Sequence, residues 1–262
     1  MIDQIYIEKW SEMSRWADGC FFHRGQHDAS WSLETSFRRS FLGTDNEEYP
    51  LNREFWCLRE FKRRAHVYLK QVPSDGDIIA WLSLMQHHGI PTRLLDFSHS
   101  FYVAAYFAIR GSIGDSAVWS ISYAPLISIS QKIFKLKIQG LRDEWDDSIY
   151  AKANGFLGKK FKSSGPENAT CLKGVSYVEP FLVHQRLGAQ QGLFLIPMDI
   201  NIPFIENLRP HVKGQPLVRK LTFNKKIRDE AMHQFEEMNI TEETLFPGID
   251  GLARSIADKV LY

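Results

Sequence analysis

Several segments of the chain repeat apolar residues every three or four positions, which is the spacing of an amphipathic helix. In residues 52–70 this stripe consists of Phe and Leu, with Arg and Lys opposite. Residues 74–88 begin with Ser/Asp capping signals and stop at a Gly-Ile-Pro sequence. The same spacing predicts helices at residues 101–109 and 252–260.

Other segments alternate apolar and polar residues and predict short strands. They are residues 117–123, 177–182 and 192–197, together with residues 20–25, which end at a glycine turn. These strands are scattered among helices without a regular βαβ alternation, which favours an α+β fold: a mixed domain with short strands and peripheral helices. Residues 139–175 are polar and Gly-containing, and we expect a long functional loop or an inserted subregion there.

Composition narrows the class of protein without identifying it. The 262 residues are 44% hydrophobic, enough for a sizeable core. The 32 basic and 31 acidic residues nearly cancel, so net charge gives no general attraction to nucleic acid or membranes. No apolar run approaches the roughly 20 residues of a membrane span. The three cysteines lie far apart in the sequence and form no CxxC pair. We therefore expect a cytoplasmic protein with reduced thiols.

The first candidate for chemistry is the sequence FFHRGQ at residues 21–26. Arg24 offers a planar fork of donors that suits phosphate or carboxylate, and Gly25 lets a ligand approach the backbone closely. The alternative is an ordinary surface arginine at a turn.

The second candidate is QHHGIPTRLLD at residues 86–96. Arg93 and Asp96 either form a buried pair that orients a loop, or Arg93 faces a ligand with Asp96 behind it. His87 and His88 are able to titrate near neutral pH. Two adjacent histidines cannot share one helical side and no further ligands lie nearby, so we expect no metal site.

The third candidate precedes the predicted strand at residues 192–197. Arg186 and Gln190 are four residues apart and would share a face of a helical turn. The amide of Gln191 either hydrogen-bonds a base or a nicotinamide-like carboxamide, or caps a neighbouring backbone. The chain contains no GxxxxGK[ST], GxGxxG, HExxH or GxSxG motif.

Together these segments resemble the FRG domain family, which is named for a Phe/Tyr-Arg-Gly signature. Here His23 directly precedes the arginine, and Phe22 lies one place earlier. The resemblance extends over residues 20–256 and implies a single FRG-type domain at residues 1–262. The similar segments are QHHGIPTRLLDFS (86–98), FYVAAYFA (101–108), QRLGAQQGLFL (185–195) and LFPGIDGLARSI (245–256).

The motif order of this family is similar to that of divergent ADP-ribosyltransferases, which implies an ADP-ribosyltransferase-like fold and NAD as the substrate. In that scheme Arg24 holds the diphosphate or the adenylate ribose of NAD. Its pocket floor corresponds to Thr92, Arg93 and Asp96. The residues expected to contact NAD are Arg24, Gly25, His88, Thr92 and Arg93, and those expected to do chemistry are Asp96, Glu179 and Gln191.

The chain departs from that scheme because no Glu begins the QQGLFL strand, and Gln191 cannot neutralise a cation. The resemblance predicts a toxin or anti-phage effector that modifies a nucleic acid or a protein, away from membranes. One alternative is a non-catalytic nucleotide or nucleic-acid binding module, suggested by the basic residues in 53–64 and 159–162. Another is a hydrolase or nuclease in which His87 or His88 acts with Asp96.

Overall fold

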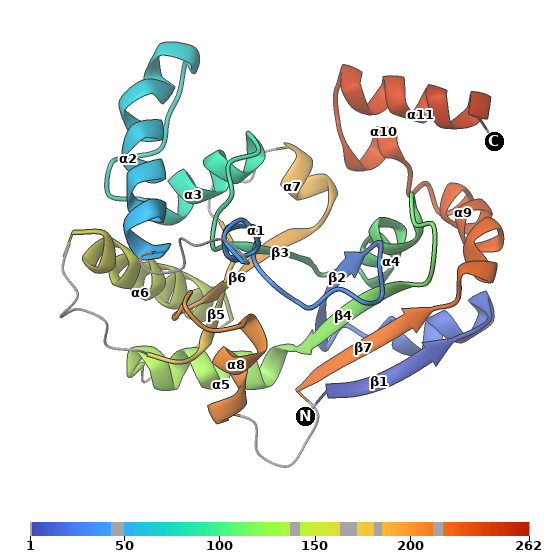
Figure 1. Cartoon of the computed structure of the whole chain (residues 1–262), viewed down its shortest axis with the longest axis horizontal. Coiled ribbons are helices and arrows are strands. Elements are labelled where there is room, and N and C mark those ends of the chain that lie inside the picture. Colours follow the sequence, from blue (N-terminus) through green and yellow to red (C-terminus); the bar gives the residue numbers. More distant parts are fainter. Residues whose placement is uncertain are drawn as a thin grey trace.

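A computed structural model describes residues 2–42, 50–136, 142–162, 172–180, 185–211 and 217–261. Within these ranges seven strands form one sheet in the order β1-β7-β4-β2-β3-β6-β5 (Figure 1). β1 and β7 pair in parallel, and every other pair is antiparallel. The strands are β1 (Ile2–Ile7), β2 (Phe21–Gln26), β3 (Leu95–Ser98), β4 (Ser116–Ser122), β5 (Val175–Val178), β6 (Gly192–Pro197) and β7 (Val218–Phe223).

Helices surround this sheet and interrupt the sequence between its strands, so the predicted α+β class is confirmed. The predicted helices at 52–70, 74–88, 101–109 and 252–260 correspond to α2, α3, α4 and α11. The helices are η1 (Trp10–Trp16), α1 (Ser36–Arg39), α2 (Pro50–Tyr68), α3 (Ile78–His87), α4 (Phe101–Ile109), α5 (Tyr123–Phe134), α6 (Arg142–Lys162), α7 (Gln185–Ala189), α8 (Phe204–Leu208), η3 (Arg209–His211), η4 (Lys225–Ile227), α9 (Arg228–Glu237), α10 (Glu242–Leu245) and α11 (Ile249–Leu261).

The segment expected to be a long functional loop or an inserted subregion, residues 139–175, contains the long helix α6, so it is not an irregular loop. Ile149, Ala153, Leu157 and Phe161 recur every four residues, and all four are buried. This stripe is hidden in the sequence because Gly, Lys and Asp residues surround it. Parts of the segment, residues 139–141 and 163–171, lie outside the described residues.

Strand predictions were less complete than helix predictions. β2, β4 and β6 lie where the alternation placed them, whereas β5 begins two residues before the predicted strand at 177–182. The alternation did not indicate β1, β3 or β7. β3 has only four residues, which is too short for a periodic signal. β1 is the edge strand of the sheet and pairs only with β7, which lies next to it.

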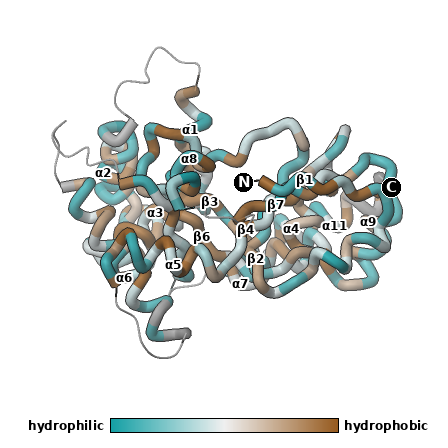
Figure 2. The backbone as a smooth tube through the Cα atoms, turned by 90° about the horizontal axis from the view of Figure 1, so that it is seen from below, coloured by the Kyte–Doolittle hydropathy of each residue, from teal (hydrophilic) through white to brown (hydrophobic). Residues whose placement is uncertain are grey.

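Alternating strand residues place apolar side chains on both faces of the sheet. One face packs against α5 and α8. The other face packs against two separate groups of helices, α4 with α9 and α2 with α3 and α6. In Figure 2 hydrophobic positions run through the interior and hydrophilic positions lie mainly on the outside. No helix among the described residues is long and apolar enough to cross a membrane.

The sheet consists of two halves that are joined at a single paired position. β2 pairs with β4 at six positions and β3 pairs with β6 at four, but β2 and β3 are paired only where His23 lies opposite Ser98. Beyond this position the two central strands diverge. The divergence lies near the boundary between the two groups of helices, which leaves room for a cavity.

Gly25 allows α4 to approach β2 at this divergence. A Cβ atom on Gly25 would lie 2.1 Å from the backbone oxygen of Ala104 and 2.6 Å from the backbone nitrogen of Ala108. Both contacts are with helix backbone, which cannot move aside as a flexible side chain would. The buried alanines of α4 serve the same close packing.

We predict that Gly25→Ala lowers the free energy of unfolding by about 2 kcal/mol or more, because α4 must move away from β2. Gly19→Ala is the matched control, since a Cβ atom there has no neighbour within 4 Å. Its effect should stay within about 0.5 kcal/mol. Urea denaturation of both variants measures the difference, and equal effects would show that the β2–α4 contact tolerates a side chain.

Candidate functional site

A cavity of about 350 Å³ lies where β2 and β3 diverge. Its walls come from the strands β2, β3 and β6, the helices α1, α3, α4 and α7, and the segment between β2 and α1. It therefore collects residues from all three segments singled out in the sequence. Among the lining residues are Arg24, Gly25, Trp31, Arg39, Gln86, His87, Asp96, Arg186 and Gln190.

The side chain of Arg24 bridges the two diverging strands. Its Nη1 atom donates to the backbone oxygen of Asp96 at 2.7 Å and lies 3.5 Å from the Asp96 carboxylate. The Arg24 side chain is 19% exposed, whereas that of Asp96 is 56% exposed. Burial lowers the pKa of Arg24 and Asp96 opposes this shift. A guanidinium stays charged in proteins, so the bridge is an ion pair at the cavity wall.

Asp96 is also held from the side of α3. Gln86 donates from Nε2 to Oδ1 of Asp96 at 2.7 Å, and its own carbonyl accepts a hydrogen bond from the Thr92 hydroxyl. Thr92 is fully buried and does not line the cavity. Thr92 thus fixes Gln86, which in turn fixes the Asp96 carboxylate.

The cavity wall is rich in positive charge. Arg24, Arg39 and Arg186 contribute guanidinium groups, and Asp96 is the sole carboxylate among the lining residues that the structure describes. The guanidinium of Arg186 lies 4.6 Å from the ring centre of Phe246. Burial lowers the pKa of Arg186, and nearby Asp96 acts in the opposite direction. The imbalance of charge suits an anionic ligand.

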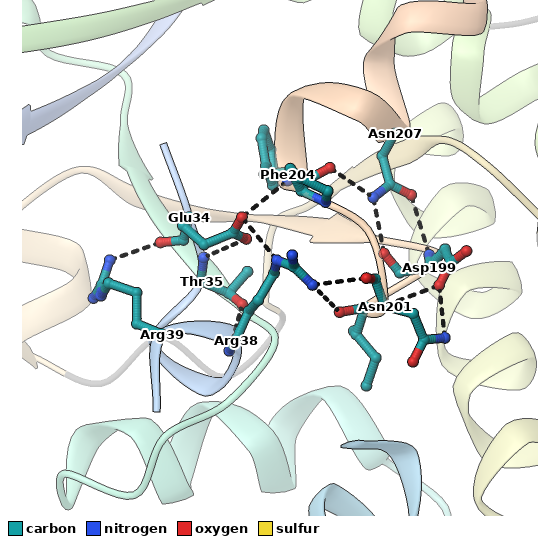
Figure 3. Close-up of polar contacts among 10 residues, drawn as sticks. Glu34, Thr35, Arg38, Arg39, Asp199, Asn201, Phe204 and Asn207 are labelled. Atoms are coloured by element: carbon teal, nitrogen blue, oxygen red, sulfur yellow. Dashed lines mark hydrogen bonds and ion pairs between the residues drawn. The ribbon is translucent and has the colours of Figure 1, made fainter. Parts of the chain in front are cut away.

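A buried network fixes the short helix that carries Arg39 (Figure 3). Glu34 is 3% exposed and accepts hydrogen bonds from Nε of Arg38 at 3.1 Å and from the backbone nitrogen of Phe204 at 3.3 Å. Arg39 donates from Nη1 to the backbone oxygen of Glu34 at 2.7 Å. No sequence pattern indicated Arg39, because its position depends on the contact between Glu34, which precedes α1, and Phe204 of the distant α8.

His23 is a cavity residue whose role the sequence did not indicate. It is 1% exposed, and its Nδ1 lies 2.9 Å from the hydroxyl of Ser120. Burial lowers the pKa of His23 to about 4, so the ring is neutral at pH 7. His23 Nε2 and Arg24 Nε are buried and lack a hydrogen-bond partner among the described residues. Unmet buried donors and acceptors cost about 1–3 kcal/mol each, so a ligand would gain by meeting them.

Arg93 does not line the cavity. It is 1% exposed and pairs with the fully buried carboxylate of Glu54, to which its Nε donates at 2.9 Å. The expected pair between Arg93 and Asp96 is therefore wrong: Arg93 pairs with α2, and Asp96 pairs with Arg24. Glu54 lies 39 residues from Arg93 in the sequence, so local spacing could not indicate this partner.

The other predicted residues lie outside the cavity lining. His88 is exposed at the end of α3, and its neighbour His87 lines the cavity instead. Glu179 lies 3.2 Å from Nε2 of His99. Gln191 has a φ of 48°, and its carbonyl accepts from the backbone nitrogen of His99 at 2.9 Å. This left-handed turn leaves Gln190 in the lining.

The structure thus brings Arg24, Gly25 and Asp96 into one wall, supported by Thr92. It places Arg93, His88, Glu179 and Gln191 elsewhere. Within the described ranges no group of three or more His, Cys, Asp or Glu is arranged to hold a metal ion.

The fold and cavity define a mixed α+β domain with a cleft lined mainly by cationic side chains. A family model of the FRG domain matches residues 19–115, which confirms the resemblance over that part of the chain. The matched residues include β2, α3, β3 and α4, and therefore Arg24, Gln86 and Asp96. Searches of curated proteins and of solved structures gave no match.

We predict that Arg93→Met lowers the free energy of unfolding by about 3–5 kcal/mol, because it leaves the buried Glu54 carboxylate unpaired. Arg93→Met combined with Glu54→Leu should recover much of this loss. Arg63→Met is the control, since Arg63 is 61% exposed in its pair with Glu60 and should cost less than about 1 kcal/mol. Denaturant unfolding is measured for the wild type and these three variants. Equal losses of stability in Arg93→Met and Arg63→Met would contradict a structural role for Arg93.

We predict that His23 makes stability fall in mild acid. Its pKa is about 4 in the folded protein and near 6.5 when unfolded, so the unfolded state binds more protons between these values. The contribution of His23 to the free energy of unfolding is complete only above pH 6.5. It falls by about 2 kcal/mol from pH 7 to pH 5. Urea unfolding of His23→Gln should lose this part of the pH dependence, whereas the exposed His66→Gln should keep it.

Proposed function

We propose that the cavity binds NAD and that the protein cleaves it, either to release ADP-ribose or to transfer it to an acceptor. One observation carries the proposal: the cavity is lined by three guanidinium groups, a single carboxylate and two buried nitrogen atoms that have no hydrogen-bond partner among the described residues. Arginine recognises phosphate with paired hydrogen bonds. A diphosphate supplies negative charge for the arginines. The neighbouring ribose hydroxyls supply hydrogen-bond partners for the buried nitrogen atoms.

The shape of the site favours an elongated ligand. A second hollow of about 190 Å³ adjoins the cavity and shares Arg24, Arg39, Gln86 and Asp96 with it. A ligand that extends from one hollow into the other would place its middle against Arg24 and Arg39. In a dinucleotide that middle part is the diphosphate.

Aromatic surface is available at the rim. Trp31 lines the cavity and is 50% exposed, so its ring offers a face for stacking a planar group. Nicotinamide and adenine are both planar. His87 lies on the same lining, and its pKa is lowered by burial and then by His88 and Arg186, which favours its neutral form.

In the proposed reaction, the bond between C1′ of the ribose and the nicotinamide nitrogen breaks. The bonding electrons go to the nicotinamide nitrogen, which leaves as neutral nicotinamide while positive charge develops on the ribose. The carboxylate of Asp96 stabilises that charge, held in place by Arg24 and Gln86. Water, or a nucleophile of the acceptor, adds to C1′ and loses a proton to solvent.

Asp96 is the best placed of the three predicted catalytic residues, because Glu179 and Gln191 do not line the cavity. Consumption of NAD, or modification of an essential acceptor, stops cell growth. We therefore propose that the protein acts in the cytoplasm as a toxin or an anti-phage defence protein, and that the acceptor is a protein or a nucleic acid.

We expect NAD at one hundred times its Kd to stabilise the wild type by about 2.7 kcal/mol, which raises its Tm by several degrees. ADP-ribose should also stabilise it, and ATP less so. Arg24→Ala should abolish the shift, whereas Arg209→Ala, with a side chain that is 60% exposed on η3, should keep it. The measurement is a thermal-shift titration with each ligand.

Asp96→Asn separates binding from turnover. The amide keeps the size of the carboxylate but lacks its charge, so NAD should still raise the Tm while nicotinamide release falls by on the order of a hundredfold or more. Nicotinamide is measured by chromatography. An absence of any NAD-dependent shift contradicts the proposal; a shift without release in the wild type would indicate the non-catalytic nucleotide-binding module.

A further inference from the structure

A second groove of about 530 Å³ lies between α2 and α6. It shares no lining residue with the cavity between β2 and β3. The two helices belong to segments separated in sequence by α3, β3, α4, β4 and α5. The fold therefore brings together the two basic stretches, 53–64 and 159–162, that the sequence had indicated separately.

The rim of this groove is positively charged on both sides. Arg59, Lys62 and Arg63 line it from α2, and Lys159 lines it from α6, against a single acidic residue, Asp75. Lys62 pairs with Asp75. Arg63 is 61% exposed although it lies 2.7 Å from Glu60. Surface pairs of this kind are weak, so a phosphate can compete for the arginine.

The floor of the groove is apolar and partly aromatic. It is formed by Phe55, Leu58, Ile78 and Phe161, and the rings of Phe55 and Phe161 are stacked with their centres 6.3 Å apart. Gly155 opens one wall, because nothing lies within 4 Å of the position its Cβ would occupy.

An exposed tryptophan adjoins the basic rim. Trp56 is 61% exposed, and it precedes Arg59 and Arg63 by three and seven residues on α2, so the three share one stripe of the helix. A flat exposed ring is costly to leave in water and offers a stacking surface for a base. Arginines next to it hold the phosphates on either side of a stacked base.

We propose that a single-stranded nucleic acid binds across the α2–α6 groove. Its phosphates contact Arg59, Arg63 and Lys159, and a base stacks on Trp56. Charge alone would also suit an acidic peptide, but the exposed tryptophan within the basic stripe favours a nucleic acid, because every base has a flat face that stacks on such a ring. Double-stranded DNA is less suited because its bases are already stacked. The site is independent of the proposed NAD chemistry.

The test is fluorescence anisotropy of a fluorescein-labelled oligothymidylate of roughly a dozen nucleotides at a series of salt concentrations. The wild type should bind with an affinity that falls steeply as salt rises. Arg63→Glu should weaken binding on the order of tenfold and reduce the salt slope by about one or more. The matched control is Arg209→Glu, because Arg209 is 60% exposed and also pairs with a Glu three residues earlier, Glu206.

Trp56→Ala should weaken binding roughly tenfold with an unchanged salt slope, since it removes stacking and no charge. Arg24→Ala should bind the strand as the wild type does, which separates this groove from the NAD site. Circular dichroism confirms that each variant is folded. No binding at low salt, or equal losses in Arg63→Glu and Arg209→Glu, would overturn the proposal. Displacement by oligoglutamate together with full binding by Trp56→Ala would overturn it in favour of an acidic peptide.

Discussion

The separation of two central strands is the constraint on which the candidate site depends. β2 and β3 share a single paired position, His23 opposite Ser98, while each pairs fully with its other neighbour. Strands that diverge leave backbone groups to be satisfied by other means. Arg24 does so by donating to the Asp96 carbonyl, and its charge is balanced by the Asp96 carboxylate. The contact between Arg24 and Asp96 that links the two diverging strands is therefore also part of the cavity wall.

Support for this bridge comes from buried polar groups behind it. Thr92 and Gln86 orient the Asp96 carboxylate, and the ion pair between Arg93 and Glu54 ties the same segment to α2. A buried pair of this kind contributes little net stability compared with apolar residues, but breaking it is costly. It therefore specifies one position of the segment that leads into β3, and with it one geometry of the cavity.

Charge is distributed over this protein in a way that its total conceals. The net charge is +1, yet the cavity has three arginines for one carboxylate, and the α2–α6 groove has four basic residues for one acidic residue. The sites differ in depth. In the cavity two buried nitrogen atoms have no hydrogen-bond partner among the described residues, which suits a small ligand that supplies one. At the groove Arg59, Arg63, Lys159 and Trp56 are exposed, which suits a chain that lies on the surface.

The sequence by itself determined the α+β class, the main helices, and the segments that form the cavity, because these depend on local periodicity and on turn residues. It singled out Arg24, Gly25 and Asp96, which line the cavity, although Gly25 lies within β2 and not at the turn that the sequence predicted. Only the tertiary structure decided which polar residues pair with one another. Arg93 pairs with Glu54, 39 residues away, and His23 owes its unmet nitrogen to burial. Contacts between distant segments leave no periodic trace in sequence, so the fold alone selects which polar residues face the ligand.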